Sequence, residues 1–197
     1  MRLVFASSNP HKVAEIAKKI ALQADIIEII GLQEIGCTTD IPETQATIEG
    51  NALQKARFVY ENYGLNCFGE DTGLEIAALN GEPGVYSARY AGEAKSTSAN
   101  MDLVLQKMAG VANRNARFKT VIALILDGKE HLFEGIIQGT IGTEKIGNSG
   151  FGYDPLFTPS GYDLTFADMP LALKNQISHR ALAVDKLLSF LTTYAKN

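Results

Sequence analysis

Residues 118–138 read FKTVIALILDGKEHLFEGIIQ, two apolar runs on either side of Asp127-Gly128. An Asp-Gly pair between runs rich in branched side chains favours a tight turn. Phe118–Leu126 and Leu132–Gln138 are therefore predicted to form an antiparallel hairpin. A sheet that contains this hairpin is at least partly antiparallel, so a purely parallel sheet is excluded.

Strands and helices are mixed along the rest of the chain. Short apolar runs predict strands at Arg2–Ala6, Ile26–Ile30 and Leu74–Leu79, the last ended by a turn at Asn80-Gly81. Helical spacing predicts four helices. The first is capped by Ser8 or Asn9 and extends to Ile20, and the second is Ile48–Tyr63, ended by Gly64. The third is Ser98–Met108, and the fourth is His179–Ala195, with an apolar face that includes Leu182, Leu187, Leu188 and Leu191. The fold class is therefore α/β, a mixed sheet flanked by helices.

The composition excludes several classes of protein. With 197 residues, 46% hydrophobic and 20% charged, the chain can bury the core of one domain or of two small lobes. Its net charge is 18 − 22 = −4, which argues against nucleic acid polymers and anionic membranes but leaves room for a short polyanion. Two cysteines without a C-x-x-C pair, and an N-terminal apolar run of only Leu3–Ala6, lead us to expect a cytoplasmic protein.

The first candidate site follows the first predicted strand. Small polar residues lead into a helix there, and a lysine stands in its first turn; the residues are Ser7, Ser8, Asn9, Pro10, His11 and Lys12. Backbone N–H groups at a helix start attract anions, so this segment could cradle a phosphate group. An ordinary capped helix with a solvated lysine is the alternative.

The second candidate is the pair Glu70-Asp71, which stands between glycines in what reads as a turn between two apolar runs. Adjacent carboxylates repel each other unless a cation or a proton lies between them, and carboxylate oxygens suit Mg²⁺. Neighbouring side chains on an extended backbone point to opposite sides, so one acid could hold a metal and the other activate water. The alternative is a solvated acidic turn.

Three weaker patterns accompany these two. Asn51 and Lys55 share one face of the second helix, and Glu43 precedes them; Gly147–Pro155 holds three glycines with Phe151, Tyr153 and Asp154; Lys174 precedes Ser178-His179-Arg180 at the start of the last helix. Each also has a plain structural explanation: a solvated helix face, a long turn with a core aromatic residue, or a basic pair balanced by a nearby acid.

Together these segments resemble the inosine/xanthosine triphosphate pyrophosphatases, enzymes that remove noncanonical purine nucleotides. The stretches that carry the resemblance are SSNPHK, GEDTGLEIAALNGEPGVYSARYAG, GFGYDPLF and ISHR, in the order of the family and across nearly the whole chain. The resemblance implies a long mixed sheet in two lobes of a single domain, residues 1–197, with the active site in a cleft between the lobes. It also implies a homodimer.

The resemblance further implies a role for each candidate residue. Asp71 would be the general base, and Mg²⁺ would be held by Glu43, Glu70 and Asp71. The substrate would be bound by Ser7, Ser8, Asn9, Pro10, His11, Lys12, Asn51, Lys55 and Thr72 around the phosphates, and by Phe151, Gly152, Tyr153, Asp154, Lys174, His179 and Arg180 around the purine. This chain has Glu70 where the family often has Asp, Thr72 where it has Ser, and Ser8 where it often has Gly.

The implied reaction is the hydrolysis of ITP, dITP and XTP to the nucleoside monophosphate and pyrophosphate. One alternative is a sensor that binds purine nucleotides without hydrolysing them, although three acids beside a polyphosphate suit a binder poorly. A second alternative is a structural or partner-binding protein in which the motifs are only turns and caps.

Overall fold

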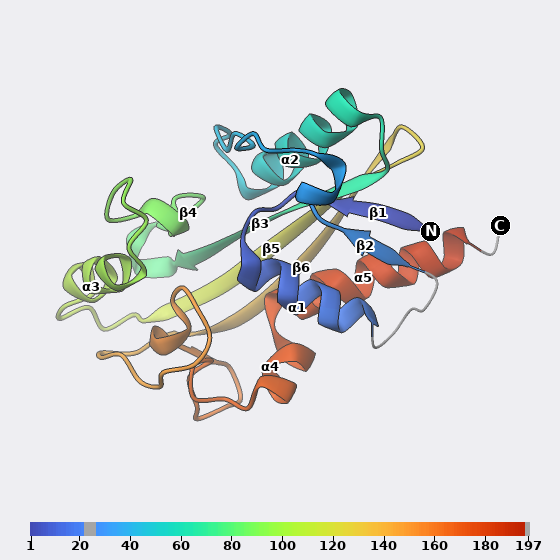
Figure 1. Ribbon diagram of the computed structural model, residues 1–197. Coiled ribbons are helices and arrows are strands. Elements are labelled where there is room, and N and C mark those ends of the chain that lie inside the picture. The colour runs from blue at the N-terminus through green and yellow to red at the C-terminus, as the bar shows by residue number, and fades with distance from the viewer. Residues whose placement is uncertain (22–26, 196–197) are drawn as a thin grey trace. The chain divides into compact units, whose positions relative to one another are not determined.

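In the computed structural model, residues 1–21 and 27–195 are described. The chain forms two compact units: unit 1 comprises Met1–Asp71, Thr120–Gly135 and His179–Asn197, and unit 2 comprises Thr72–Lys119 and Ile136–Ser178. The helices are α1 (Pro10–Ala21), α2 (Ile48–Tyr63), α3 (Thr97–Lys107), α4 (Leu171–Ile177) and α5 (His179–Tyr194) (Figure 1). Single turns of 3-10 helix cover Gln33–Ile35, Ala77–Leu79, Ser87–Arg89 and Asp154–Leu156.

The described strands form one mixed sheet, as the sequence predicts. They are β1 (Arg2–Phe5), β2 (Glu28–Ile30), β3 (Cys67–Ile76), β4 (Pro83–Gly84), β5 (Asn115–Leu126), β6 (Lys129–Ile141) and β7 (Phe157–Pro159). Their order is β2-β1-β3-β5-β6-β7, with β4 paired to β3. β1 is parallel to β2 and β3, whereas β4 on β3 and β7 on β6 are antiparallel. The boundary between the two units falls within β3, β5 and β6.

The predicted hairpin is confirmed, and both of its strands are longer than expected. Asp127 and Gly128 have φ angles of 49° and 78°, and two positive φ angles are what a tight hairpin turn requires. The side chain of Asn66 stabilises this turn through two hydrogen bonds. Asn66 Nδ2 donates to Asp127 Oδ1 at 3.0 Å, and Asp127 N donates to Asn66 Oδ1 at 2.8 Å.

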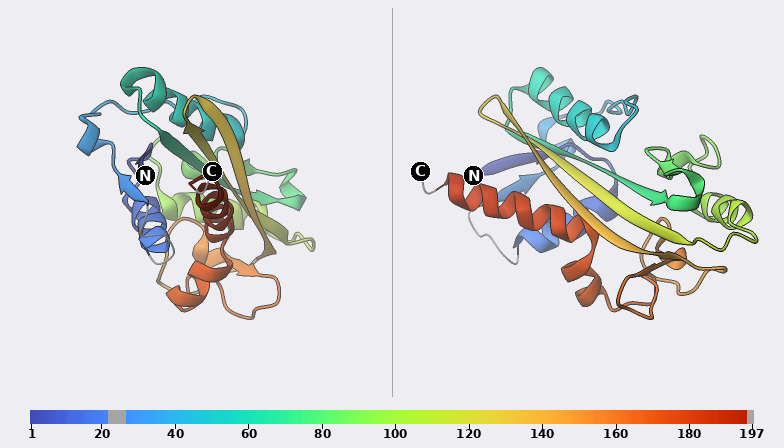
Figure 2. Two further views of the ribbon diagram at one scale, coloured as in Figure 1. Left: turned by 90° about the vertical axis from the view of Figure 1, so that its right-hand side faces the viewer. Right: turned by 180° about the vertical axis from the view of Figure 1, so that it is seen from behind.

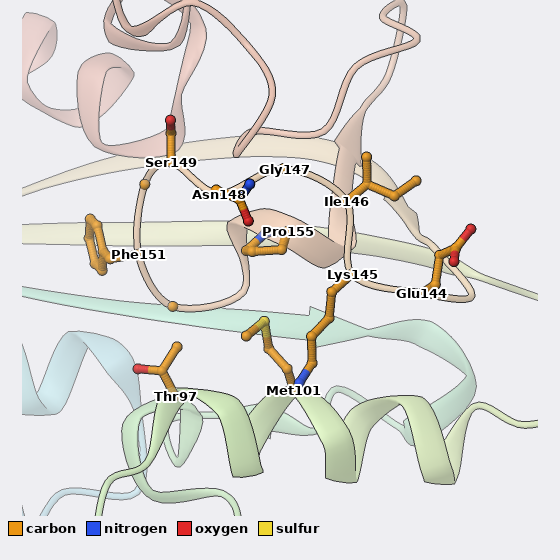
Figure 3. A pocket seen from close by; sticks show the side chains of 12 residues that line it. Thr97, Met101, Glu144, Lys145, Ile146, Gly147, Asn148, Ser149, Phe151 and Pro155 are labelled. Atoms are coloured by element: carbon orange, nitrogen blue, oxygen red, sulfur yellow. The ribbon is translucent and has the colours of Figure 1, made fainter.

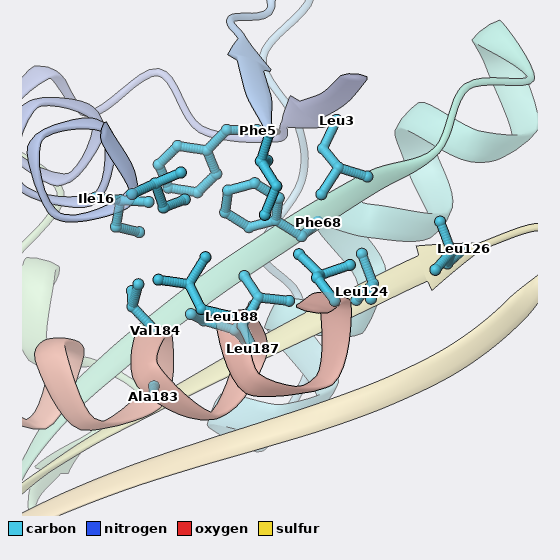
Figure 4. Packing of buried hydrophobic residues seen from close by; sticks show 14 residues of the cluster. Leu3, Phe5, Ile16, Phe68, Leu124, Leu126, Ala183, Val184, Leu187 and Leu188 are labelled. Atoms are coloured by element: carbon cyan, nitrogen blue, oxygen red, sulfur yellow. The ribbon is translucent and has the colours of Figure 1, made fainter. Parts of the chain in front are cut away.

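Unit 1 encloses its own apolar core between the sheet and two helices. Phe5 of β1 lies opposite Phe68 of β3, and their rings stack with centroids 4.6 Å apart. Leu124 from β5 and Leu187 from α5 complete this cluster (Figure 4). α1 packs against α5 on this face of the sheet, and α2 covers the opposite face (Figures 1 and 2).

Unit 2 has a separate core built around aromatic rings. Phe118 meets Phe157 edge to face with centroids 4.7 Å apart, and Phe157 lies 5.3 Å from Phe166. Val104 from α3 and Leu74 from β3 belong to the same cluster. Each unit therefore carries an apolar interior of its own.

α2 lies unusually close to β3. A methyl group on Gly69 would stand 2.3 Å from Ala52 O and 2.9 Å from Ala56 N, so a side chain does not fit there. The helix begins and ends as predicted: Thr47 accepts a hydrogen bond from Gly50 N at 3.0 Å, and Gly64 ends the helix with φ 66°. This close contact at Gly69 fixes the distance from α2 to Glu70 and Asp71, the two residues that follow.

Three expectations about secondary structure need correction. Residues 68–73 are not a turn but the middle of β3, whose backbone continues because both of its faces are buried. The predicted strand Leu74–Leu79 ends at Ile76, where a 3-10 turn begins, and Asn80 at φ 52° terminates that turn. Leu182 is exposed on α5, whereas Leu187 and its neighbours face the core. Ile26 of the predicted second strand lies outside the described residues.

Candidate active site

β3 places its two acids on opposite sides of the sheet. Glu70 contacts Lys12 of α1 and Arg180 of α5, whereas Asp71 contacts Lys55 and Asn51 of α2. The cause is the alternation of side chains along an extended strand, which the sequence predicted for this pair. The two carboxylates therefore have separate environments, so each can have a separate role.

Glu70 is buried and held between two cations. Its Oε2 lies 2.6 Å from Lys12 Nζ, and its Oε1 lies 3.2 Å from Arg180 Nη2. Arg180 also reaches Glu15 of α1, with Nη1 2.6 Å from Glu15 Oε2. A buried carboxylate is tolerated only when it is paired in this way. Arg180 lies in the first turn of α5, where a positive charge is unfavourable beside the helix dipole, and the negative charges of Glu15 and Glu70 offset this effect.

Asp71 is held by α2 on the other side of the sheet. Lys55 Nζ lies 3.3 Å from Asp71 Oδ1 and also forms a short ion pair with Glu43 Oε1. Asn51 Nδ2 donates to Asp71 Oδ2 at 3.3 Å. One ammonium group thus lies between two acids that are 28 positions apart in the sequence, counted as 71 − 43.

Burial and crowding shift the proton affinities of this cluster. Burial raises the pKa of Asp71, Lys55 and Lys12 oppose that shift, and the charges of Glu43 and Glu70 reinforce it. Burial also acts to lower the pKa of Lys55, but the charges of Asp71 and Glu43 outweigh it and leave that pKa raised. Lys55 therefore stays protonated, and Asp71 binds a proton more readily than an exposed aspartate does.

The segment before α1 is organised by Asn9. Its Oδ1 accepts hydrogen bonds from His11 N at 3.0 Å and from Lys12 N at 3.3 Å, so Asn9 is the helix cap that the sequence predicted. Ser7 Oγ accepts from Asn9 N at 3.2 Å. Ser8, Pro10 and His11 are exposed, whereas Lys12 turns inward to Glu70. The capping carboxamide and an incoming anion would therefore compete for the same amides.

Unit 2 brings together Phe151, Asp154 and Lys174. Lys174 Nζ lies 2.7 Å from Asp154 Oδ2, and both side chains are buried. Phe151 N donates to the same oxygen at 2.8 Å, and Lys174 Nζ lies 5.3 Å from the centroid of the Phe151 ring. Tyr153 is packed in the core with its hydroxyl donating to Ser87 O at 2.7 Å, as expected for the core aromatic residue of a turn.

Gly150 and Gly152 flank Phe151, and both have positive φ angles, which glycine adopts without strain. Gly150 has a φ of 78°, and a methyl group on it would stand 2.2 Å from Asp154 Oδ2. Gly152 has open space around it but a φ of 64°, which glycine adopts without strain.

A family model described as the Ham1 family matches residues 3–190 of this chain. The chain belongs to the Ham1 family. Two relatives are each called dITP/XTP pyrophosphatase. The protein of Flavobacterium johnsoniae is 53% identical over 192 residues, which cover 98% of this chain and 98% of the relative. The protein of Porphyromonas gingivalis is 54% identical over 191 residues, which cover 96% of this chain and 97% of the relative. The resemblance in the motifs is thereby confirmed.

Solved structures of Ham1 proteins have the same fold. The Staphylococcus aureus Ham1 protein is 38% identical, covers 98% of this chain with 100% of its own, and superposes with a TM-score of 0.90. A Ham1 protein from Coxiella burnetii is 36% identical, covers 98% of this chain with 99% of its own, and has the same TM-score of 0.90. The mixed α/β architecture is therefore that of the Ham1 family.

Unit 2 of this Ham1 protein also contains a cavity of about 700 Å³. It lies between α3 and the loop that leads to Phe151, and Figure 3 shows Thr97 and Met101 rising from the helix toward that loop. Pockets of this size hold small organic ligands, and an aromatic wall suits a flat ring.

Among residues 1–21 and 27–195, no three His, Cys, Asp or Glu side chains converge in a geometry ready to hold a metal ion. Carboxylate oxygens nevertheless suit a hard cation; Glu43 and Asp71 both contact Lys55, whereas Glu70 contacts Lys12 and Arg180 on the other side of the sheet. In the same described part of the Ham1 chain, no helix is both long and apolar enough to cross a membrane.

Glu15 belongs to the cluster of ion pairs around Glu70, but none of the sequence motifs contains it. It is three residues from Lys12 on α1, so both project from one side of the helix toward Glu70 and Arg180. That spacing is visible in the sequence, but its meaning depends on Arg180, which is 165 positions away. Thr72, the residue after Asp71, is half-buried and belongs to unit 2.

Proposed function

We propose that this Ham1 protein hydrolyses noncanonical purine nucleoside triphosphates, namely ITP, dITP and XTP, to the nucleoside monophosphate and pyrophosphate. The observation that carries the proposal is the pair Glu70-Asp71 on opposite faces of β3, each beside a lysine at a short distance. The relatives called dITP/XTP pyrophosphatase, which match almost end to end, support the choice of substrates.

Asp71 is the proposed general base. Hydrolysis forms a bond between a water oxygen and phosphorus and breaks the anhydride bond between the first and second phosphates, and the proton lost by the water goes to Asp71. Burial raises the pKa of Asp71 and so strengthens it as a proton acceptor, while Lys55 keeps it ionised. Lys12 and Lys55 stabilise the negative charge that develops on the phosphate oxygens.

The charge balance around Glu70 and Asp71 supports a requirement for Mg²⁺. Four carboxylates, Glu15, Glu43, Glu70 and Asp71, are paired there with three cations, Lys12, Lys55 and Arg180. The protein's own positive charge is therefore already compensated before a triphosphate arrives. Glu43, Glu70 and Asp71 would hold the ion, which when bound would neutralise phosphate charge and acidify water.

The proposed selectivity depends on the atom at position 6 of the purine. Hypoxanthine and xanthine present an acceptor oxygen there, whereas adenine presents an amino donor. Lys174 and Arg180 are donors only, so they can bond to that oxygen but not to an adenine amino group, although each already contacts a carboxylate of the protein. Phe151 would stack on the ring, and His179 and Asp154 would contact its edge.

A panel of nucleotides tests the proposal. Purified protein with Mg²⁺ is given ITP, dITP, XTP, ATP and GTP, and the pyrophosphate released is converted to phosphate by added inorganic pyrophosphatase and measured by colour. We expect turnover of ITP, dITP and XTP well above that of ATP. Equal turnover of ATP and ITP would refute the selectivity, and binding of ITP without turnover would favour the sensor.

We also propose that the protein acts in the cytoplasm, because its two cysteines do not make a disulfide framework, and, from the family resemblance, that it is a homodimer. Light scattering coupled to size-exclusion chromatography measures the mass directly, against a chain mass of 21.3 kDa. A mass equal to one chain across the range of concentrations used in the activity assay would contradict the dimer.

A further inference from the structure

Asn51 joins two parts of the active site through a single carboxamide. It lies on α2, one turn before Lys55, and is buried. Its Oδ1 accepts a hydrogen bond from Gln45 N at 2.9 Å, and its Nδ2 donates to Asp71 Oδ2 at 3.3 Å. Gln45 belongs to the segment that carries Glu43, so Asn51 ties this segment to the proposed base.

The chemistry of the two partners fixes the orientation of the amide. A backbone N–H can only donate, so the oxygen of Asn51 must face Gln45. The nitrogen then faces Asp71, whose ionised carboxylate can only accept. Asparagine is therefore suited to this position: leucine would leave both partners without their bond, and aspartate would keep the bond to Gln45 but lose the donor to Asp71.

The two oxygens of Asp71 are held separately. Lys55 Nζ lies 3.3 Å from Oδ1, and Asn51 Nδ2 lies 3.3 Å from Oδ2. Two donors from adjacent turns of one helix fix the rotation of the carboxylate about its last bond. A general base must present a lone pair in a defined direction, so its orientation limits the rate of proton transfer.

We propose that Asn51 is a positioning residue, which orients Asp71, and that it does not bind the nucleotide. This inference rests on the proposed function, because Asp71 has a base to orient only if the protein hydrolyses a nucleotide. Both polar ends of the Asn51 side chain are engaged within the protein at hydrogen-bonding distance.

α2 supplies a matched control one turn further along. Gln54 Oε1 accepts from Thr44 N at 2.9 Å, and Gln54 Nε2 donates to Thr44 Oγ1 at 2.9 Å. Gln54 thus anchors the same segment, through the residue next to Gln45, with a carboxamide of the same kind. Comparing Asn51→Leu with Gln54→Leu separates the effect on Asp71 from the effect of loosening the segment.

The experiment measures kcat and KM for ITP, together with the calorimetric affinity and stoichiometry for a nonhydrolysable α,β-imido analogue of ITP. We expect Asn51→Leu to lower kcat roughly 10- to 100-fold, the usual loss when a supporting hydrogen bond at an active site is removed. KM and the affinity for the analogue should stay within about twofold, because the nucleotide loses no contact. Gln54→Leu should keep kcat within about twofold.

The stoichiometry counts the protein that can still bind, so a fall in kcat without a fall in stoichiometry is not misfolding. If Asn51→Leu does not fold, Asn51→Ala removes the donor to Asp71 without adding a charge beside it, and we expect the same fall in kcat. Weaker binding of the analogue with an unchanged kcat, or equal losses in the Asn51 and Gln54 variants, would overturn the inference. A wild-type protein without turnover would overturn the proposed function and the inference together.

Discussion

At the scale of single residues, the site depends on carboxylates that the protein itself has to neutralise. Glu70 and Asp71 are adjacent in sequence and both buried, an arrangement that is unstable without cations on each side. Lys12 and Arg180 satisfy the first acid, and Lys55 with Asn51 satisfies the second. Because the two acids have different partners, replacing one should change the reaction without removing the other's contacts.

Asp71→Asn tests the role of the base. Asparagine has nearly the same shape, but it cannot accept the proton of the attacking water. We expect kcat for ITP to fall roughly 10²- to 10⁴-fold, the range attributed to general acid–base catalysis, while the nucleotide still binds. Steady-state kinetics and calorimetry with the imido analogue measure the two effects. An Asp71→Asn protein with wild-type turnover would show that another group takes the proton.

At the scale of helices and strands, the contact between β3 and α2 sets the geometry of the site. Gly69 immediately precedes the two acids, and the backbone of α2 at Ala52 occupies the space that a side chain would need. The residues that meet Asp71 lie on either side of Ala52 along this helix, Asn51 just before it and Lys55 three residues after it. Any outward shift of α2 therefore moves Lys55 and Asn51 away from the base.

Gly69→Ala is expected to destabilise the protein by about 1–3 kcal/mol, the usual cost of overpacking a tight contact. Urea unfolding followed by circular dichroism measures the change in the free energy of unfolding. Gly31→Ala is the matched control, since a methyl group there meets only Glu34 Oε1 at 3.6 Å. We expect that variant to be neutral or slightly stabilised. A Gly69→Ala protein as stable as Gly31→Ala would show that α2 adjusts without cost.

The sequence predicted the elements whose signals are local. The end of α2 follows from Gly64, and the hairpin follows from Asp127-Gly128. The sequence predicts a turn at Glu70-Asp71, because the pair stands between glycines and two apolar runs, and this prediction is wrong. The partners that make this buried pair possible lie on three helices far apart in the sequence, and no local pattern records them.

α4 shows the same limit on prediction at the level of a whole element. It is seven residues long, follows Pro170, and begins with the exposed Leu171, so it has too few turns to show an apolar period. Lys174 on this helix is nevertheless a candidate site residue in the sequence, because it precedes Ser178-His179-Arg180, and the structure pairs it with Asp154. The cleft between the lobes stays a prediction.

At the scale of the whole molecule, electrostatics decides which polyanion can bind. The net charge of −4 opposes long nucleic acids, and in the cluster around Glu70 and Asp71 four paired acids face three paired cations. A triphosphate adds several more negative charges to this site. The protein alone therefore repels its proposed substrate, and a divalent cation reverses the balance locally while leaving the rest of the surface acidic.

Removing divalent cations is therefore expected to weaken binding as well as turnover. In EDTA we expect ITP hydrolysis to fall to background and the calorimetric affinity for the imido analogue to drop at least about tenfold, and both should return when Mg²⁺ is added in excess. The control replaces Mg²⁺ with NaCl at the same ionic strength, which screens the acids without binding between them. If NaCl restores the affinity as well as Mg²⁺ does, screening alone explains the effect and the carboxylates hold no metal. Undiminished turnover in EDTA would show that Lys12 and Lys55 suffice to stabilise the triphosphate, despite the acids with which they are paired.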